Sequence, residues 1–419
     1  MSETTFNLRT LNLAAGTYSI TVQAEAEGYT TSDASNAVNY TSATPIPTDS
    51  ILFAGETSDF TLKATNKEWD GTVEYSTDKN TWNTWDGSEI SSANKKLYLR
   101  GKNNTRFYTS YGARFVLSKK AGCYGNINTL LDYENPPTAL ASNCYNSMFR
   151  GCKSLTTAPE LPATTLANYC YHEMFYGCTS LTTAPELPAT TLASDCYNSM
   201  FRDCTSLTTA PELPATTLAT YCYNSMFLGC TSLTTAPALP ATTLASDCYS
   251  SMFRGCTSLT TGPSILPATT LASNCYSSMF YGCTSLTTAP ELPATTLATY
   301  CYAGMFQGCT SLTTAPTLPA TTLATYCYAG MFQGCTSLTT APALPATTLA
   351  NFCYYYMFYG CTSLKISATQ TGEYTTAWRI PSAGEIAAEA TNWNRDMLKN
   401  TGGTFTANPS INTTYYIAA

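Results

Sequence analysis

Cysteine is the residue type of this chain whose number and spacing most suggest chemistry, because a thiolate can bind a metal or act as a nucleophile. The 419 residues include 19 cysteines and a single histidine, His172. Eighteen of the cysteines form nine C-x7-C pairs, from Cys144 and Cys152 to Cys353 and Cys361. Zinc sites use closer spacings such as C-x2-C, usually with histidine. The spacing therefore favours neither a metal site nor a histidine-based catalytic site, and no cofactor is expected.

Disulfide pairing is also disfavoured by the spacing. Two cysteines eight residues apart on a short helix would have Cα atoms about 12 Å apart, whereas a disulfide requires less than about 7 Å. Cysteines stacked on neighbouring coils would point in parallel, with Cβ atoms about 4.8 Å apart rather than about 3.8 Å. We therefore predict buried free thiols that serve as small core side chains.

The other polar groups with catalytic potential are scattered. His172, beside Glu173, takes a position where other repeats have Asn, Ser, Ala or Tyr, which indicates variation on an outward surface. Neighbouring carboxylates about 5 Å apart would repel by roughly 0.8 kcal/mol in water. We therefore expect the recurring acidic row to be solvated, with a calcium or polyamine contact as the alternative. This row consists of Glu160, Glu186, Glu212 and Glu291.

An internal repeat must position all of these residues. The C-x7-C pairs recur every 26 residues, with one step of 27 between Cys248 and Cys275, where a residue is inserted around Ser264 and Ile265. The consensus unit is CYxxMFxGCTSLTTAPxLPATTLAxx. A fixed period of this size predicts a solenoid, whose coils bury their apolar faces by stacking on one another.

Within one unit the pattern predicts a short helix followed by a strand. From Cys144 to Cys152 the apolar residues fall at i, i+1, i+4, i+5 and i+8, which is one face of about two helical turns. A side chain able to cap a helix precedes each first cysteine by two positions. A glycine such as Gly151 ends every segment but one, where Asp203 replaces it. The following Ser-Leu-Thr-Thr-Ala-Pro alternates, with Leu155 inward, and predicts a parallel ladder that ends at the proline.

The run LPATTLAxxCYxxMFxGCTSLTxAP resembles the BspA-type leucine-rich repeat in its LP start, its central Phe and its GC-x-x-L turn. The resemblance covers about 240 of the 419 residues. Proteins with such repeats include bacterial surface adhesins, protist surface proteins and gut phage proteins. The resemblance implies a mainly β protein with short helices, built as a right-handed leucine-rich-repeat solenoid of nine 26-residue coils.

The flanking regions complete the expected domain organisation. Residues 1–43 resemble the last strands of an immunoglobulin-like (Ig-like) or fibronectin-type domain, and we expect this half-domain to be an anchor that another chain completes. A linker covers 44–50, and alternating strands with three tryptophans predict a small β-sandwich over 51–121. The repeats, with an irregular first coil, cover 122–364. Residues 365–419 form a capping region, which a solenoid requires at its exposed end.

Composition narrows the classes of function. Only 11% of the residues are charged, the net charge is -7, and no basic patch is available to bind nucleic acid. No stretch reaches about 18 consecutive apolar residues, so no membrane insertion is expected. The first residues lack the basic start and apolar core of a secretory signal, so we expect synthesis and folding in the cytosol. A glycosidase-like enzyme would require a carboxylate pair. Because the acids of the repeats are scattered, we predict a non-enzymatic protein.

Differences between the repeats mark a candidate partner-binding face. The variable positions form two outward columns, one directly after Met-Phe and one directly before the first cysteine. Aromatic, amide and guanidinium side chains on a rigid face suit recognition of carbohydrate or protein. Sequence drift on a solvent-facing surface is the alternative. The candidate residues are Arg150, Tyr176, Arg202, Arg254, Tyr281, Gln307, Gln333 and Tyr359 in the first column, and Tyr169, Tyr221, Tyr300 and Tyr326 in the second.

These features together predict a bacteriophage virion fibre or adhesin that presents the solenoid for host-surface recognition or virion attachment. Made in the host cytoplasm and carried on the virion, it would contact other virion proteins through its N-terminal region. Its repeats would bind a host-surface glycan or protein. A homotrimer is expected, because fibres are commonly trimeric. The alternative is a BspA-like adhesin of the bacterial cell surface whose leader lies upstream of this sequence.

Overall fold

The chain divides into two compact units, residues 1–48 and 49–419. The computed structural model describes residues 16–20, 38–42, 46–65, 69–107 and 114–418. In the first unit, β1 (Gly16–Ile20) and β2 (Val38–Ser42) form an antiparallel pair. Both strands fall in segments for which the sequence predicts strands. The sequence also predicts a strand over residues 5–11, TFNLRTL, which lie outside the described residues.

The second unit begins with two β-sheets whose aromatic side chains meet. One sheet has the strand order β11-β10-β3-β8-β5-β6 and the other the order β7-β4-β9. The ring of Phe115 lies between them, with its centroid 6.2 Å from that of Phe53 and 5.5 Å from that of Trp85. The strands are β3 (Ile51–Gly55), β4 (Thr61–Ala64), β5 (Thr72–Ser76), β6 (Asn83–Thr84), β7 (Ile90–Ser91), β8 (Lys96–Lys102), β9 (Phe115–Leu117) and β10 (Ala121–Tyr124).

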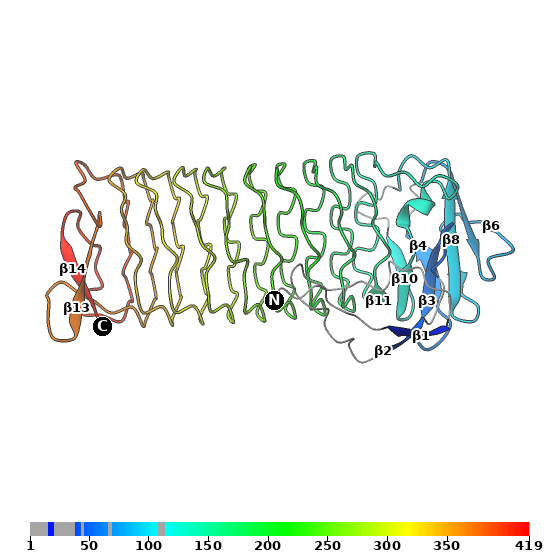
Figure 1. The fold of residues 1–419 in the computed structure, drawn as a ribbon, viewed down its shortest axis with the longest axis horizontal. Coiled ribbons are helices and arrows are strands. Elements are labelled where there is room, and N and C mark those ends of the chain that lie inside the picture. Colours follow the sequence, from blue (N-terminus) through cyan, green and yellow to red (C-terminus); the bar gives the residue numbers. More distant parts are fainter. Residues whose placement is uncertain (1–15, 21–37, 43–45, 66–68, 108–113, 419) are drawn as a thin grey trace, which may run out of the picture. The chain divides into compact units, whose positions relative to one another are not determined.

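The larger sheet continues directly into the repeats. Strand β10 pairs antiparallel with β3 and parallel with β11 (Leu155–Thr157). A 3-10 helix, η2 (Ile127–Leu130), follows β10 and is fully buried. The backbone N–H of Phe115 in β9 also donates to the carbonyl of Met148 at 2.8 Å. The two sheets therefore cover the N-terminal end of the stacked coils (Figure 1).

The segment between the two cysteines of a repeat is not a helix, so the helix prediction is wrong. Within the described residues it consists of turns in which alternate backbone N–H groups have different partners. Met200 N–H donates to the carbonyl three residues earlier, that of Tyr197, at 3.2 Å. Ser199 N–H instead donates to Asn224 in the next repeat, at 2.8 Å. About half of the backbone N–H groups in this segment thus donate to the neighbouring coil instead of to a carbonyl of the same coil.

Left-handed residues at every fourth position explain why no helix forms. In one repeat Asp195, Ser199 and Asp203 have φ values of 59°, 55° and 57°. A helix requires an uninterrupted run of right-handed residues, so each of these positions ends it after three. The i, i+4 spacing of the apolar residues fits both structures, because a four-residue turn unit and a helix return the side chain to the same face. The expected left-handed glycine is confirmed, for example at Gly177 with φ 71°, and Asp203 adopts the same conformation.

Substitutions at the left-handed positions are expected to change stability in opposite directions. A Cβ added at Gly177 would meet only the Cα and N of Gly151, at 3.7 and 3.9 Å, which are ordinary contacts, so Gly177→Ala is a test of backbone strain alone. We expect it to lower the free energy of unfolding by about 1 kcal/mol. Ser251→Gly, at φ 56°, is expected to raise it by about 0.5 kcal/mol. Glycine is already present at the position of Ser251 in two other repeats, as Gly304 and Gly330. Urea unfolding of Gly177→Ala and Ser251→Gly measures both changes in the free energy of unfolding.

The predicted ladder is present only in reduced form. Only β11 is a continuous strand among the described repeats, and its Leu155 is buried as predicted. In later repeats single parallel bridges join equivalent threonines, such as Thr183 with Thr209 and Thr191 with Thr217. Each bridge lies close to a proline, which has no N–H to donate to a ladder. The coils are therefore held together mainly through the turns between the cysteines.

The core of the repeats consists of columns of identical side chains. Tyrosines from Tyr145 to Tyr354 stack with centroid distances of 5.7–5.9 Å, and phenylalanines from Phe149 to Phe358 at 5.5–5.7 Å. All 19 cysteines are free and buried, as predicted. From the second repeat on, the second cysteine donates its S–H to the carbonyl of a phenylalanine in the preceding repeat, as Cys230 does to Phe201 at 3.1 Å. Thiols therefore both fill the core and satisfy a buried carbonyl.

The C-terminal end of the stack continues the same hydrogen-bonding pattern with different residues. Tyr354 N–H donates to Trp393 at 2.8 Å, and Phe358 N–H donates to Met397 at 3.0 Å. Trp393 and Met397 are buried at positions that correspond to core residues of a repeat. A three-stranded antiparallel sheet in the order β12-β14-β13 lies at this end of the stack (Figure 1). Its strands are β12 (Ile366–Ser367), β13 (Tyr374–Arg379) and β14 (Thr414–Ala418).

Candidate binding surface

The first predicted column, after Met-Phe, carries alternating charged and aromatic groups in the N-terminal repeats. The guanidinium carbon of Arg150 lies 4.7 Å from the ring centroid of Tyr176, and that of Arg202 lies 5.4 Å from it. Arg150 also forms an ion pair with Glu173, and both of these side chains are largely covered. Arg254 repeats the arrangement over Tyr281 at 4.5 Å. These contacts hold long side chains in place, which lowers the entropic cost of binding a partner.

The remaining members of this column lie further along the stack and are half-buried. The side-chain oxygen of Gln307 would lie 3.2 Å from a Cβ added at Gly304, and Gln333 relates to Gly330 in the same way at 3.3 Å. Each glutamine therefore folds back over the left-handed glycine of its own repeat. The amides cover the turn without reaching away from the coil, and Tyr359 ends the column.

The second predicted column contains the most exposed aromatic side chains of the repeats. Tyr169, Tyr221 and Tyr300 are 42%, 39% and 39% exposed. Each has a positive φ, because it occupies the first left-handed position of its repeat. Tyr326 is half-buried, since its ring is stacked between Tyr300 and Phe352, with both centroid distances 4.6 Å. The structure therefore places this column on an outward surface, as predicted.

Tyr355 and Tyr356, which comparison of the repeats with one another missed, join the two columns. Tyr355 packs edge-on against Tyr326, and its ring centroid is 4.1 Å from that of Tyr356. Tyr356 in turn lies 5.1 Å from Tyr359 in the first column. The signal for this cluster was the run NFCYYYMFYG in the last repeat, where tyrosines replace the small residues of other repeats.

The pKa values of three titratable side chains near the second column are shifted by burial or by a neighbouring charge. Burial raises the pKa of Asp247. The charge of Asp247 in turn raises the pKa of the neighbouring Tyr221 hydroxyl. His172 is half-buried with its ring 5.8 Å from that of Tyr169, and burial lowers its pKa. These shifts keep Tyr221 and His172 neutral near pH 7, so both act as aromatic, hydrogen-bonding surface groups.

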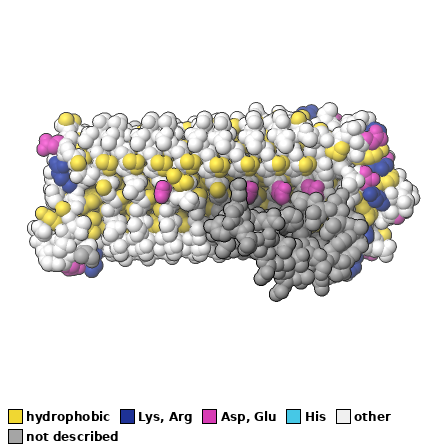
Figure 2. All heavy atoms as spheres, viewed as in Figure 1, with side chains coloured by type: hydrophobic (Ala, Val, Ile, Leu, Met, Phe, Trp, Pro, Cys, Tyr) yellow, Lys and Arg dark blue, Asp and Glu magenta, His cyan; other side chains and the backbone are white. Residues whose placement is uncertain are grey.

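The acidic row is exposed along the stack, as expected, at Glu160, Glu186, Glu212 and Glu291. Figure 2 shows acidic side chains separated from one another among rows of hydrophobic ones. Among the described residues no group of three or more His, Cys, Asp or Glu side chains could hold a metal ion.

Burial raises the pKa of every thiol, for example that of Cys152 to about 11 and that of Cys196 to about 12. These thiols are therefore poor nucleophiles at neutral pH. In the described part of the chain no helix is long and apolar enough to span a bilayer.

Comparison with known proteins identifies the repeats. The family model described as the BspA type leucine-rich repeat region (6 copies) matches residues 139–260 and 246–365, which together are more than half of the chain. A solved structure of a leucine-rich repeat protein from Bacteroides ovatus is similar at 19% sequence identity, with a TM-score of 0.27. The match covers 58% of this chain and 71% of that one. A search of curated proteins found no match.

Proposed function

Because the chain belongs to the BspA-type leucine-rich repeat family, we propose that it is a non-enzymatic recognition protein that presents its outward columns to a surface glycan or protein. In this proposal nine coils form a right-handed solenoid, and the N-terminal region, an Ig-like half-domain, anchors it to other proteins. The observation that carries the proposal is the contrast between the constant core and the varied columns. The core residues recur in every repeat, whereas Tyr, Asp, Asn and Phe alternate directly before the first cysteine.

Two biological settings fit such a protein. The family match agrees with an adhesin on a bacterial cell surface, which we propose as the primary setting. A virion fibre, in which the chain forms a homotrimer and contacts other virion proteins, is the second. The charge poverty and the aromatic columns suit either setting, because both require a stable surface that binds without catalysis. Which cells the protein binds separates them: bacterial cells for a fibre, and another organism's cells or matrix for an adhesin.

Replacing exposed tyrosines by asparagine tests the proposal without damaging the fold. Asn274 occupies this column in another repeat at φ 55°, and asparagine tolerates the left-handed conformation. We expect the triple variant Tyr169→Asn, Tyr221→Asn, Tyr300→Asn to bind at least about tenfold less well than the parent, because aromatic side chains dominate interface energies. Binding of labelled protein to panels of bacterial and animal cells measures the effect.

A matched control changes the same stack at a different surface. Glu186→Ala with Glu212→Ala introduces the residue that Ala238 and Ala343 already provide in other repeats. This double variant is expected to bind as the parent does. If the tyrosine variant kept full binding to every cell type that the parent binds, the column would not be the recognition surface.

A further inference from the structure

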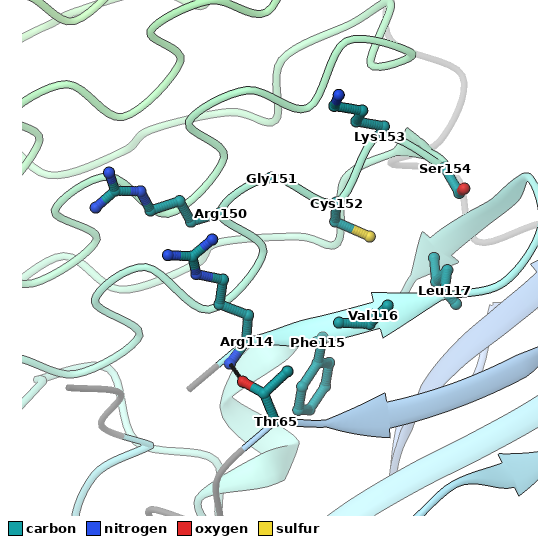
Figure 3. A pocket seen from close by; sticks show the side chains of 10 residues that line it. All are labelled: Thr65, Arg114, Phe115, Val116, Leu117, Arg150, Gly151, Cys152, Lys153 and Ser154. Carbon is teal, nitrogen blue, oxygen red and sulfur yellow. Dashed lines mark hydrogen bonds between the residues drawn. The ribbon is translucent and has the colours of Figure 1, made fainter. Parts of the chain in front are cut away.

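A pocket of about 330 Å³ lies where the two sheets meet the first repeat. Strand β9 and the residue before it contribute Arg114, Phe115 and Val116, and the first repeat contributes Arg150 and Lys153. Figure 3 shows the side chains of Arg114 and Arg150 on one side of Gly151 and that of Lys153 on the other. The volume of the pocket is at the lower end of the range of small-molecule sites. It therefore suits a ligand of the size of one sugar ring.

Among the described residues, the lining of this junction pocket contains three cations and no acid. Residues 123–361 contain only four basic side chains, and two of these, Arg150 and Lys153, line the pocket. Lys153 is a departure from the repeat, because threonine stands at this position in every other repeat, as Thr179 and Thr205 do. The cation thus occurs only in the repeat that borders the sheets, where Arg114 supplies the third positive charge.

Neighbouring groups hold the backbone of Arg114 and the guanidinium of Arg150 in place. The backbone N–H of Arg114 donates to the hydroxyl of Thr65 at 2.9 Å, and its Nη1 lies 3.6 Å from the position of a Cβ added at Gly151. Arg150 lies over the ring of Tyr176 and is paired with Glu173. The described residues that line the pocket thus carry three positive charges, one of which is paired with Glu173. Fixed arginines of this kind bind planar or tetrahedral oxyanions through paired N–H donors.

An apolar wall accompanies the charges. Phe115 and Leu117 are buried, and Val116 between them is 37% exposed, which makes it one of the few large hydrophobic side chains at the surface. An inorganic anion would gain nothing from this wall. A sugar ring offers both groups that the pocket could contact, an oxyanion for the cations and a C–H face for the valine.

From these features we propose that the junction pocket binds a single sugar residue that carries an oxyanion, either a sulfate ester or a carboxylate. The proposal deepens the proposed function, on which it rests, by naming the ligand class of one site. Arg114 and Arg150 hold the oxyanion, Lys153 adds positive charge from the opposite side, and the ring lies against Val116. The junction pocket is separate from the second column, which carries the exposed Tyr169, Tyr221 and Tyr300.

Calorimetric titration of the full chain tests the proposal with four probes: glucose 6-sulfate, glucuronate, glucose and inorganic sulfate. At least one of the two anionic sugars is expected to bind at least about tenfold more tightly than glucose and inorganic sulfate, and which one binds identifies the oxyanion. Lys153→Thr and Arg150→Gln are expected to weaken that binding about tenfold each, as for loss of a charge-assisted hydrogen bond. Both substitutions introduce a residue found at the same position in other repeats.

Arg395→Gln is the matched control, because Arg395 is an exposed arginine at the C-terminal end of the stack that belongs neither to the pocket lining nor to the outward columns. It is expected to leave sugar binding unchanged. The proposal is overturned if neither anionic sugar binds, if inorganic sulfate binds as tightly as the sugars, or if Lys153→Thr binds as the parent does. Absence of sugar binding in calorimetry, together with loss of cell binding in the tyrosine variant, would overturn the junction site alone. Full cell binding by the tyrosine variant would instead contradict the proposed function.

Discussion

Raising the pH from 8 to 10 is expected to unfold the repeats cooperatively at 25 °C. The reason is the burial of the thiols, which raises the pKa of Cys248, for example, from 9.0 to about 12 and that of Cys170 to about 11. In the unfolded chain these thiols ionise near pH 9, whereas in the folded chain they stay protonated. The unfolded state therefore binds fewer protons above pH 9, and stability falls as pH rises.

The size of this effect follows from the number of thiols. Each thiol with a raised folded-state pKa lowers the free energy of unfolding by about 0.4 kcal/mol at pH 9 and by about 1.4 kcal/mol at pH 10. The contribution is fully present well below pH 9, declines as the pH rises above 9, and is lost once the pH passes the folded-state pKa values of about 11 to 12. The pKa of every one of the 19 thiols is raised in the folded state, so the combined loss at pH 10 exceeds the whole stability of an ordinary domain, about 5–15 kcal/mol. The melting temperature, followed by circular dichroism at each pH, measures the decline.

A single-thiol variant separates this cause from a general effect of alkali. Burial raises the pKa of Cys222 well above its ordinary value, and Cys222→Ala removes one titrating group from the middle of the stack. The variant is expected to be less stable than the parent at pH 8. Its loss of unfolding free energy between pH 8 and pH 10 should, however, be smaller by about 1.4 kcal/mol. An identical loss in both proteins would show that thiol ionisation does not drive the alkaline transition.

Phe227→Ala is expected to lower the free energy of unfolding by about 3–5 kcal/mol, the usual cost of truncating a fully buried phenylalanine. Phe227 is 0% exposed and stacks between Phe201 and Phe253, with both centroid distances 5.6 Å. Its removal leaves a cavity that interrupts the column. Since each repeat contacts mainly its neighbours, we also expect the two halves of the stack to unfold in separate steps. Urea unfolding followed by tyrosine fluorescence and by circular dichroism measures both effects.

The neighbouring residue provides the control for this prediction. Leu228 belongs to the variable outward column and is half-buried, so Leu228→Ala is expected to cost less than about 1 kcal/mol and to keep a single transition. Equal losses of stability in the two variants would contradict the assignment of the phenylalanine column as the continuous core.

The character of the repeats could be predicted from the sequence because it depends on period and composition. A 26-residue period with identical apolar positions can bury those positions only by stacking. The same reasoning predicted that the cysteines are buried, that Leu155 points inward and that the aromatic residues before the first cysteine point outward. It also located the left-handed glycines at the ends of the segments, but not Gly304 and Gly330 inside them.

The candidate surface was predicted only in part. Comparing one variable position at a time located the two columns but missed Tyr355 and Tyr356, whose importance lies in their contacts with Tyr326 and Tyr359. The junction pocket was missed for a similar reason. Arg114 is 36 residues from Arg150 in the chain, and only the packing of β9 against the first repeat brings them to one pocket.

The sequence by itself determined that identical coils stack around a core of tyrosine, phenylalanine, methionine and cysteine. Only the tertiary structure decided that the coils are built from turns instead of helices. The apolar positions recur every four residues in both cases, so the pattern cannot distinguish them. What decides is the partner of the backbone: Ser199 N–H reaches Asn224 in the next repeat, and this hydrogen bond exists only once that repeat is in place. Stacking therefore supplies the hydrogen bonds between repeats that offset the conformational cost of a left-handed residue at every fourth position.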